Sequence, residues 1–305
     1  MSKIDLLIKN INTFVQKAES DEVEELEAAV ADFPELKDVP SLVEEYEKTT
    51  SKLLRLQRKT FLNALNGFIS KDDSDTLESI LAFFQNDLFA SDEFAELFGK
   101  ETAVFLTLTV TQLAEKIMHS IDAEIPFKVL SEKTAEWIES WSQELAQLMK
   151  LNTHTAIEQT LKDGIKEGRS IQEIELELKD LPEFSRKRAR VTAITEVLTA
   201  SSVAQHESYV QSPAVTAKQW KHSGGKKNQS RESHVQLDGT IIPLDEEFEI
   251  PGSGERCMFP RDTKLSPKER INCHCAVGPV VDPVILGLSA EEKEEIRRRV
   301  LQNME

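Results

Sequence analysis

Apolar residues recur with the period of an α-helix from the start of the chain to about residue 210, and this pattern limits the fold more than any other feature. In the first segment, helical spacing would bring five apolar residues to one face: Ile4, Leu7, Ile8, Ile11 and Val15. The same spacing returns in four later segments, at 43–65, 77–88, 131–148 and 184–209. A mainly helical region is therefore predicted for the first two thirds of the chain.

Local signals predict where some of these helices begin and end. Pro34 and Pro40 break the first pattern, and Ser41 with Glu44 has the form of a capping box, so a helix is expected to begin at Ser41.

Further along, Gly164 and Gly168 are expected to interrupt the helix that begins at Ser131. A second capping box, Ser170 with Glu173, predicts a short helix that ends before Pro182.

The pattern changes after Ser212-Pro213. Short β-branched segments bounded by Gly, Pro, Asn and Asp predict strands within 215–220, 240–250 and 276–286. A charged helix is expected from Ser289 to about Gln302. The predicted fold class is α+β, with a long helical N-terminal region followed by a small C-terminal module of short antiparallel strands.

Charge is unevenly distributed along the chain. The net charge is −17, and residues 1–150 carry 15 Lys/Arg against 29 Asp/Glu. Residues 186–234 contain nine Lys/Arg and three Glu, which gives this segment a net charge of +6. Weak, salt-sensitive DNA binding is therefore predicted only for this basic segment, through Lys226, Lys227 and Arg231. The alternative is a solvated loop.

No signal peptide or membrane span is predicted. The first residues carry charges inside their apolar run, and no apolar run approaches the roughly 20 residues of a span. A soluble protein kept in a reducing cytoplasm is expected, with no membrane partner.

The three cysteines are Cys257, Cys273 and Cys275. In an extended segment Cys273 and Cys275 would share one face, with His274 on the other. Together with His234, and with Cys257 or His222 as a fourth ligand, they form a candidate zinc site. The alternative is a packed, metal-free thiol cluster, which the unusual C-x-C spacing slightly favours.

Catalysis is not predicted. His234, Asn272 and His274 with a metal would suit a nuclease, and Cys273 with His234 as its base would suit a nucleophilic enzyme, but nothing in the sequence selects either. The sequence contains no P-loop, no G-x-S-x-G and no H-E-x-x-H motif.

The order of certain residues over 186–276 resembles the minor head proteins of tailed bacteriophages, the family named for the F protein of phage Mu. The matching positions are Arg190, Thr195, Glu196, Lys218, Trp220, Arg231, His234, Asp238, Gly239, Phe248, Pro260, Ile271, Asn272, Cys273 and Cys275. Two positions depart from the family pattern: His274 stands where Arg is usual, and Cys257 is an extra thiol.

The resemblance implies a protein of the phage head interior, made in the host cytoplasm, that associates with the portal protein and acts in head morphogenesis and in DNA packaging and ejection. The major capsid or scaffolding protein and double-stranded DNA are further possible partners. The implied domains are a partner-binding helical domain at 1–180, the Mu F-like module at 181–285 and a terminal helix at 286–305. A nuclease or toxin-like enzyme and a transient scaffolding factor are the alternatives.

Overall fold

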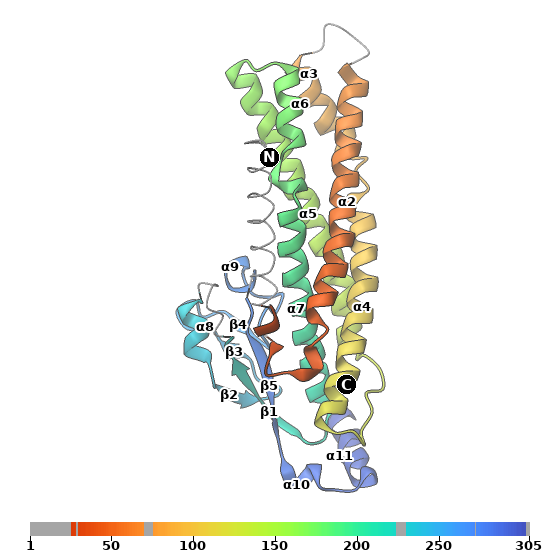
Figure 1. The fold of residues 1–305 in the computed structure, drawn as a ribbon, viewed down its shortest axis with the longest axis vertical. Helices are drawn as coiled ribbons and strands as arrows, with labels where there is room; N and C mark the ends of the chain where they lie inside the picture. The colour runs from red at the N-terminus through yellow and green to blue at the C-terminus, as the bar shows by residue number, and fades with distance from the viewer. Residues whose placement is uncertain (1–25, 29, 70–75, 224–229, 272, 303–305) are drawn as a thin grey trace, which may run out of the picture. The chain divides into compact units, whose positions relative to one another are not determined.

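A computed structural model describes residues 26–302 apart from 29, 70–75, 224–229 and 272. The helix expected around Ile4–Val15 lies outside these residues. Residues 34–211 are mainly helical and are followed by two small antiparallel sheets with short helices, as the sequence predicts (Figure 1). No helix among the described residues is both long enough and apolar enough to cross a membrane.

The helical region contains six α-helices and short 3-10 and π segments within its described residues. The α-helices are α2 (Val39–Ile69), α3 (Leu77–Phe83), α4 (Phe94–Ile121), α5 (Glu132–Glu167), α6 (Ile171–Lys179) and α7 (Arg186–Gln211). A 3-10 turn at Pro34–Leu36 precedes α2, a π-helical segment at Phe84–Leu88 continues α3, and a second 3-10 turn at Pro182–Phe184 precedes α7.

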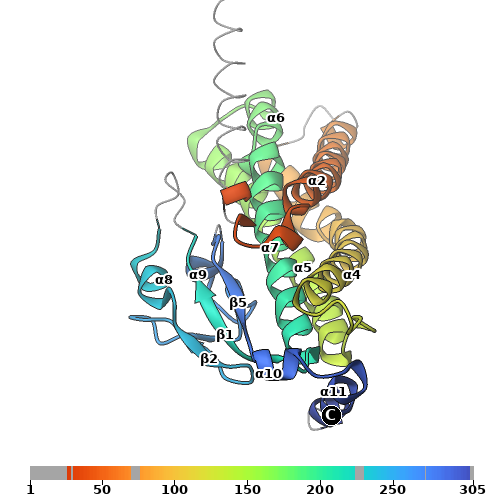
Figure 2. The same cartoon turned by 60° about the horizontal axis from the view of Figure 1, so that its bottom comes forward.

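The strands follow α7, with short helices between them. They are β1 (Val215–Lys221), β2 (Ile241–Pro243), β3 (Phe248–Glu249), β4 (Arg256–Cys257) and β5 (Ala276–Val281), and the helices are α8 (Glu232–Leu237), α9 (Pro267–Arg270), α10 (Pro283–Leu286) and α11 (Ala290–Gln302). One sheet has the order β2-β1-β5 (Figure 2), and the other pairs β3 with β4. The register between β1 and β5 places Trp220 opposite Val277.

The chain forms two compact units. One, called the helical unit below, comprises 43–108 and 132–196, and the other, called the sheet unit, comprises 1–42, 109–131 and 197–305. The predicted boundary between residues 180 and 181 remains a prediction.

The helical unit has a core rich in phenylalanine, leucine and isoleucine. Phe61, Phe84 and Leu161 are among the residues buried in it. Some polar groups buried inside the unit are paired across helices: Tyr46 hydrogen bonds Thr102 at 2.7 Å. Burying a polar group without such a partner costs free energy, so these pairs fix how the helices meet.

In the sheet unit, segment 109–131 holds the end of α7 and helix α11. Gln211 Nε2 donates to the carbonyl of Val129, and Arg297 Nη2 donates to Gln211 Oε1. Lys293, which is 2% exposed, pairs with Asp122 at 2.8 Å. Removal of 109–131 would therefore leave buried polar groups of α7 and α11 unpaired.

Several sequence-based expectations about element ends were confirmed and others were wrong. Ser170 and Glu173 form the predicted capping box of α6. Helix α2 begins at Val39 and not at Ser41, because Pro40 is accepted in a first turn, where its missing N–H is not needed.

Two other elements differ from the prediction. Gly164 does not interrupt α5, which continues to Glu167. Residues Pro283–Leu286, expected in a strand, form the short helix α10, which Asp282 caps by accepting from the Val284 N–H.

Gly164 is inside α5 because another helix packs closely against it. A Cβ at this position would lie 2.3 Å from Ile174 Cδ1 and 3.0 Å from Ile174 Cγ1. We expect Gly164→Ala to lower the free energy of unfolding by about 1–3 kcal/mol, since overpacking displaces the α6 side chains.

The matched control is Gly67→Ala in α2, where an added Cβ would meet nothing within 4 Å. The free energy of unfolding of Gly67→Ala should rise by up to about 1 kcal/mol, because alanine has a higher helix propensity than glycine. Denaturant titration of both variants measures the difference, and equal stabilities would contradict the close packing at Gly164.

Candidate functional site

Two cysteines and a histidine meet in the interior of the sheet unit. His234 Nδ1 lies 3.4 Å from Cys273 Sγ and 3.7 Å from Cys275 Sγ. The three side chains are at most 3% exposed, and their potential ligand atoms all lie within 4.8 Å of one another. These residues are called the Cys–His cluster below.

His222 adjoins the cluster on one side. Its Nδ1 lies 3.5 Å from Cys275 Sγ, while its Nε2 is 3.1 Å from Ser230 Oγ. It is not among the residues whose ligand atoms lie within 4.8 Å of one another. His222 thus contacts one sulfur and is partly buried.

The other two candidate residues of the sequence, Cys257 and His274, do not belong to the Cys–His cluster. Cys257 on β4 is fully buried, and burial raises the pKa of its thiol well above the usual range. Burial likewise lowers the pKa of His274 to about 4, so this imidazole is neutral at pH 7. Both residues therefore stay uncharged at neutral pH.

Neither cysteine lies in a strand, contrary to the sequence-based expectation. Helix α9 ends at Arg270, the Cys273 N–H donates to the Arg270 carbonyl, and β5 begins only at Ala276. Both sulfurs nevertheless lie near the same imidazole.

Helix α8 positions His234, and a glycine turn follows it. Gly239 has φ +78, a conformation that glycine adopts without strain, and its N–H donates to the Trp220 carbonyl at 2.9 Å. Asp238 Oδ1 accepts from the backbone N–H of His222. The fully buried Trp220 ring meets the His234 ring edge-on at 5.5 Å between centroids.

A buried carboxylate orients the histidine. Glu269 Oε2 lies 3.1 Å from His234 Nε2, and these side chains are 3% and 1% exposed. The carboxylate thus engages Nε2 of the imidazole, and Nδ1 faces the sulfurs. The same arrangement orients histidines that ligate metals in proteins.

A buried guanidinium holds the two cysteine backbones. Arg261, which is 1% exposed, donates through Nη1 to the carbonyls of Cys273 at 2.7 Å and Cys275 at 2.5 Å, and through Nη2 to Ser202 Oγ at 2.6 Å. Its φ of 66 lies in the left-handed region, which is strained for a residue with a Cβ. Burial lowers the pKa of Arg261.

The two cluster thiols are driven to different protonation states. A hydrogen bond from Cys275 holds the pKa of Cys273 well below its usual range, with further contributions from His234 and Arg261. Donation of that hydrogen bond and burial raise the pKa of Cys275 well above its usual range. Of the two cluster thiols, Cys273 is therefore the one more readily ionised, beside the Arg261 guanidinium.

Other predicted site residues have structural partners or lie outside the described part of the chain. Arg231 donates to the carbonyls of Lys268 at 2.7 Å and Ile271 at 2.6 Å, so its guanidinium connects α8 to the turn after α9. The structure does not describe Lys226, Lys227 and Asn272.

The first part of the motif belongs to the helical unit. Glu196 accepts from Trp141 Nε1 at 2.7 Å, and Arg190 pairs with Glu47 at 3.1 Å. Thr195 is 3% exposed. These motif residues hold helices together rather than joining the Cys–His cluster.

Sequence reasoning missed Arg261 and Glu269, which contact the cluster directly. Both lie close to Cys273 and Cys275 in the sequence, in the segments "FPRD" and "KERINC". Neither segment has a spacing that distinguishes a buried ion partner from a surface charge, so the sequence offered no signal for either role.

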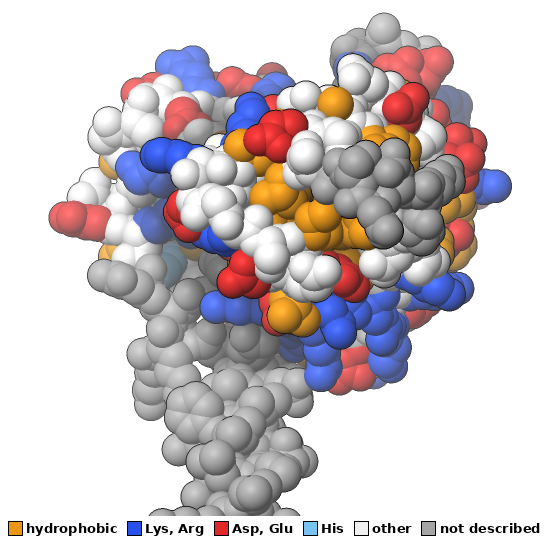
Figure 3. All heavy atoms as spheres, turned by 90° about the horizontal axis from the view of Figure 1, so that it is seen from above, with side chains coloured by type: hydrophobic (Ala, Val, Ile, Leu, Met, Phe, Trp, Pro, Cys, Tyr) orange, Lys and Arg blue, Asp and Glu red, His pale blue; other side chains and the backbone are white. Residues whose placement is uncertain are grey.

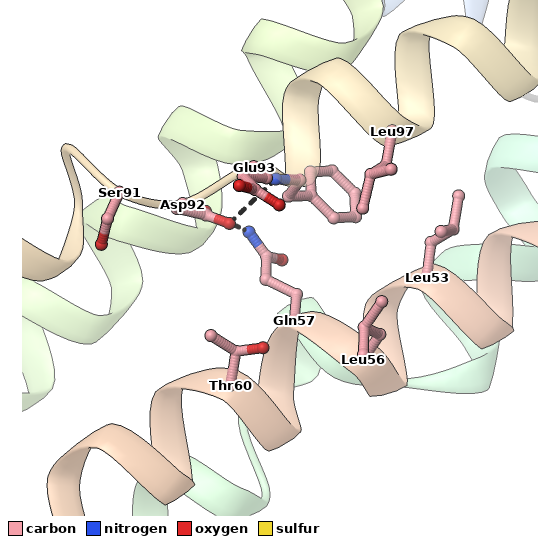
Figure 4. A pocket seen from close by; sticks show the side chains of 9 residues that line it. Leu53, Leu56, Gln57, Thr60, Ser91, Asp92, Glu93 and Leu97 are labelled. Carbon is pink, nitrogen blue, oxygen red and sulfur yellow. Dashed lines mark hydrogen bonds between the residues drawn. The ribbon is translucent and has the colours of Figure 1, made fainter.

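A second candidate site is a pocket on the helical unit, between α2 and the start of α4. It has a volume of about 220 Å³ and is lined by Leu53, Leu56, Gln57, Thr60, Ser91, Asp92, Glu93, Phe94 and Leu97 (Figure 4). At its floor Asp92 accepts from Gln57 at 2.8 Å and lies 2.8 Å from His154 Nε2. Although burial opposes it, these hydrogen bonds lower the pKa of Asp92.

Apolar side chains continue from this pocket along α4. Leu97, Val104 and Leu108 are 41%, 56% and 66% exposed, and their spacing puts them on one face of the helix. Leu56 on α2 is 48% exposed. These four residues are called the apolar stripe below.

The helical unit also exposes apolar surface at one end. Phe68, Ile69 and Phe83 are only partly buried against its core. The view toward the end that carries α3 and α6 shows hydrophobic side chains among charged ones (Figure 3).

Comparison with known proteins identifies relatives of the chain. The model of a family described as "Phage Mu protein F like protein" matches residues 155–278. The uncharacterized protein YqbB of Bacillus subtilis (strain 168) is 59% identical over 305 residues, which is the full length of both chains.

A more distant relative is the NAD(+)–arginine ADP-ribosyltransferase EFV of Enterococcus faecalis (strain ATCC 700802 / V583). It is 30% identical over 182 residues, which cover 59% of this chain and 33% of that protein. No solved structure matches the chain significantly.

Arg261 gives the first test of the cluster. Arg261→Ala should lower the free energy of unfolding by about 3–5 kcal/mol, because it leaves the carbonyls of Cys273 and Cys275 and a buried thiolate without their partner. Arg261→Gly should lower it by about 1 kcal/mol less, since glycine relieves the backbone strain at φ 66.

Urea unfolding of the full chain, followed by circular dichroism, measures both changes. A loss below about 1 kcal/mol in Arg261→Ala would contradict the role of the guanidinium, because surface substitutions typically stay within half that value.

Proposed function

The chain belongs to the family of Phage Mu protein F like proteins, and from this premise we propose that it is a minor capsid protein of a tailed bacteriophage. In this proposal it associates with the portal protein and acts in head morphogenesis and in DNA packaging and ejection. It would be made in the host cytoplasm and remain inside the head. The observation that carries the proposal is the family match over 155–278, which includes every residue of the Cys–His cluster.

We propose an assembly role rather than an enzymatic one. Burial supports this choice: Cys273, Cys275 and His234 are at most 3% exposed, so a substrate could not reach the thiolate without opening the sheet unit. The ADP-ribosyltransferase relative extends well beyond the matched third of its length. Its activity therefore does not transfer to this chain through the match.

The apolar stripe is our proposed contact with the portal. Exposed leucine and valine side chains on a helix face are suited to pack against an apolar groove or helix of a partner. The adjoining pocket, with Leu53 and Leu97 in its lining, can accept a side chain from that partner.

Portal association and virion content test the proposed function together. The full chain, co-expressed with the portal protein of the same phage, should co-purify with it and should be detected in mature virions by mass spectrometry. Presence in proheads but absence from mature virions would instead indicate a transient scaffolding factor. No association with either would overturn the proposal.

The apolar stripe predicts a specific weakening of portal binding. Leu56→Ser combined with Leu97→Ser should raise the Kd for the portal at least about tenfold, because two exposed apolar anchors are lost. The control is Leu176→Ser on α6, which removes a leucine that is 62% exposed and does not line the pocket. Equal Kd values for the double variant and the control would reject this surface.

We also propose weak, sequence-independent DNA binding through the basic segment 186–234. Lys226→Ala with Lys227→Ala should reduce the slope of log K against log salt concentration by up to about 2, because each phosphate contact releases counterions. Arg231 is left unchanged in this test, since its guanidinium binds backbone carbonyls.

Lys52→Ala with Lys59→Ala removes two exposed lysines from α2 and serves as the matched control. Fluorescence anisotropy with a DNA duplex at several salt concentrations gives the slopes. If the variant with Lys226→Ala and Lys227→Ala has the slope of the wild type, the basic segment does not bind DNA through these lysines.

A further inference from the structure

We propose that the sheet unit binds a zinc ion through His234, Cys273, Cys275 and His222. The site would be structural, joining the end of β1, helix α8 and the turn before β5. The inference concerns the Cys–His cluster alone and does not depend on the portal or on DNA.

The distances fit tetrahedral zinc. With Zn–S bonds of about 2.3 Å and Zn–N bonds of about 2.0–2.1 Å, a tetrahedron separates sulfur and nitrogen ligands by about 3.5 Å. His234 Nδ1 lies 3.4 Å and 3.7 Å from the two sulfurs, and His222 Nδ1 lies 3.5 Å from Cys275 Sγ. All three separations agree with the tetrahedral value.

His222 is the fourth ligand best placed to complete the site. Its Nδ1 already contacts Cys275, and its Nε2 hydrogen bonds Ser230, which leaves Nδ1 as the metal-facing nitrogen. A movement of this partly buried side chain toward the other two ligands closes the tetrahedron. Cys257 is a poorer candidate, because its thiol is not among the ligand atoms within 4.8 Å of one another.

The surroundings of the ligands also fit a metal. Glu269 fixes the His234 ring through Nε2. In zinc sites, carboxylates that do not bind the metal orient the zinc-bound histidines in the same way. Arg261 holds the carbonyls of both cysteines, so it fixes the backbone that carries the two sulfurs. The buried Trp220 ring packs edge-on against the histidine, which is itself 1% exposed.

Zinc would also balance the charge of the site. Cysteine ligates as thiolate, so binding of the divalent ion releases the protons still held by the two thiols. Two thiolates neutralise the charge of the ion. The other buried charged groups beside the ligands, Arg261 and Glu269, are of opposite sign, and Arg261 already binds three acceptors.

The first experiment measures metal in the full chain. Protein is purified without a metal-affinity step from zinc-supplemented cells. It should contain about one zinc per chain, as measured by inductively coupled plasma mass spectrometry. Cobalt(II) added to the metal-free protein should give sulfur-to-cobalt charge transfer and the visible bands of a tetrahedral site. Absence of both zinc and these bands would overturn the proposal.

Variants assign the ligands. Cys273→Ser, Cys275→Ser and His234→Ala should lose the cobalt bands, whereas Cys257→Ser should keep them, because it removes a buried thiol outside the cluster. Retention of the full spectrum by His222→Ala would overturn His222 as the fourth ligand.

A measurement on the wild type alone guards against variants that fail to fold. Addition of zinc to metal-free protein in weak buffer should release protons, and chelation should lower the melting temperature and expose the cluster thiols to a thiol reagent. Unchanged proton balance and thiol reactivity would contradict metal binding even if every variant were unfolded.

Discussion

The hydrogen bonds of the Arg261 guanidinium are the interaction on which the sheet unit depends. A guanidinium that is 1% exposed costs several kcal/mol to desolvate unless its donors find acceptors, and here Nη1 and Nη2 reach two carbonyls and one hydroxyl. The carbonyls belong to Cys273 and Cys275, and the hydroxyl belongs to Ser202 on α7. One side chain thus joins the segment that carries both thiols to the helix that precedes the sheet, and its charge lowers the pKa of the Cys273 thiol.

Much of the fold could be predicted from the sequence because helical periodicity is a local property. The capping box at Ser170 and the change of pattern after Pro213 also depend only on neighbouring residues, and the structure agrees with both. The expectation about Gly164 failed for the opposite reason. Its role is a close approach to Ile174 on another helix, and local pattern contains no information about such an approach.

The candidate site was partly predictable for a related reason. Cysteine and histidine are common metal ligands, so Cys273, Cys275 and His234 could be chosen as candidates from the sequence. The resemblance to a known family also placed all three in one motif. Arg261 and Glu269 are common charged residues, and their importance comes from burial that only the packed structure reveals. The sequence-based slight preference for a metal-free cluster rested on the C-x-C spacing, which is not the usual zinc knuckle, and on a family pattern that requires no fourth ligand. Our zinc proposal departs from that preference because the structure brings both sulfurs to one imidazole.

The discontinuous course of the chain separates the two kinds of site. The chain enters the helical unit at residue 43, leaves it after 108, returns at 132 and leaves again after 196. The apolar stripe belongs entirely to the helical unit, and the Cys–His cluster belongs entirely to the sheet unit. The sheet unit keeps its chemically reactive groups buried and paired, whereas the helical unit exposes leucine and valine side chains that contribute little to its own core. Loss of the cluster should therefore weaken the sheet unit without removing the apolar stripe.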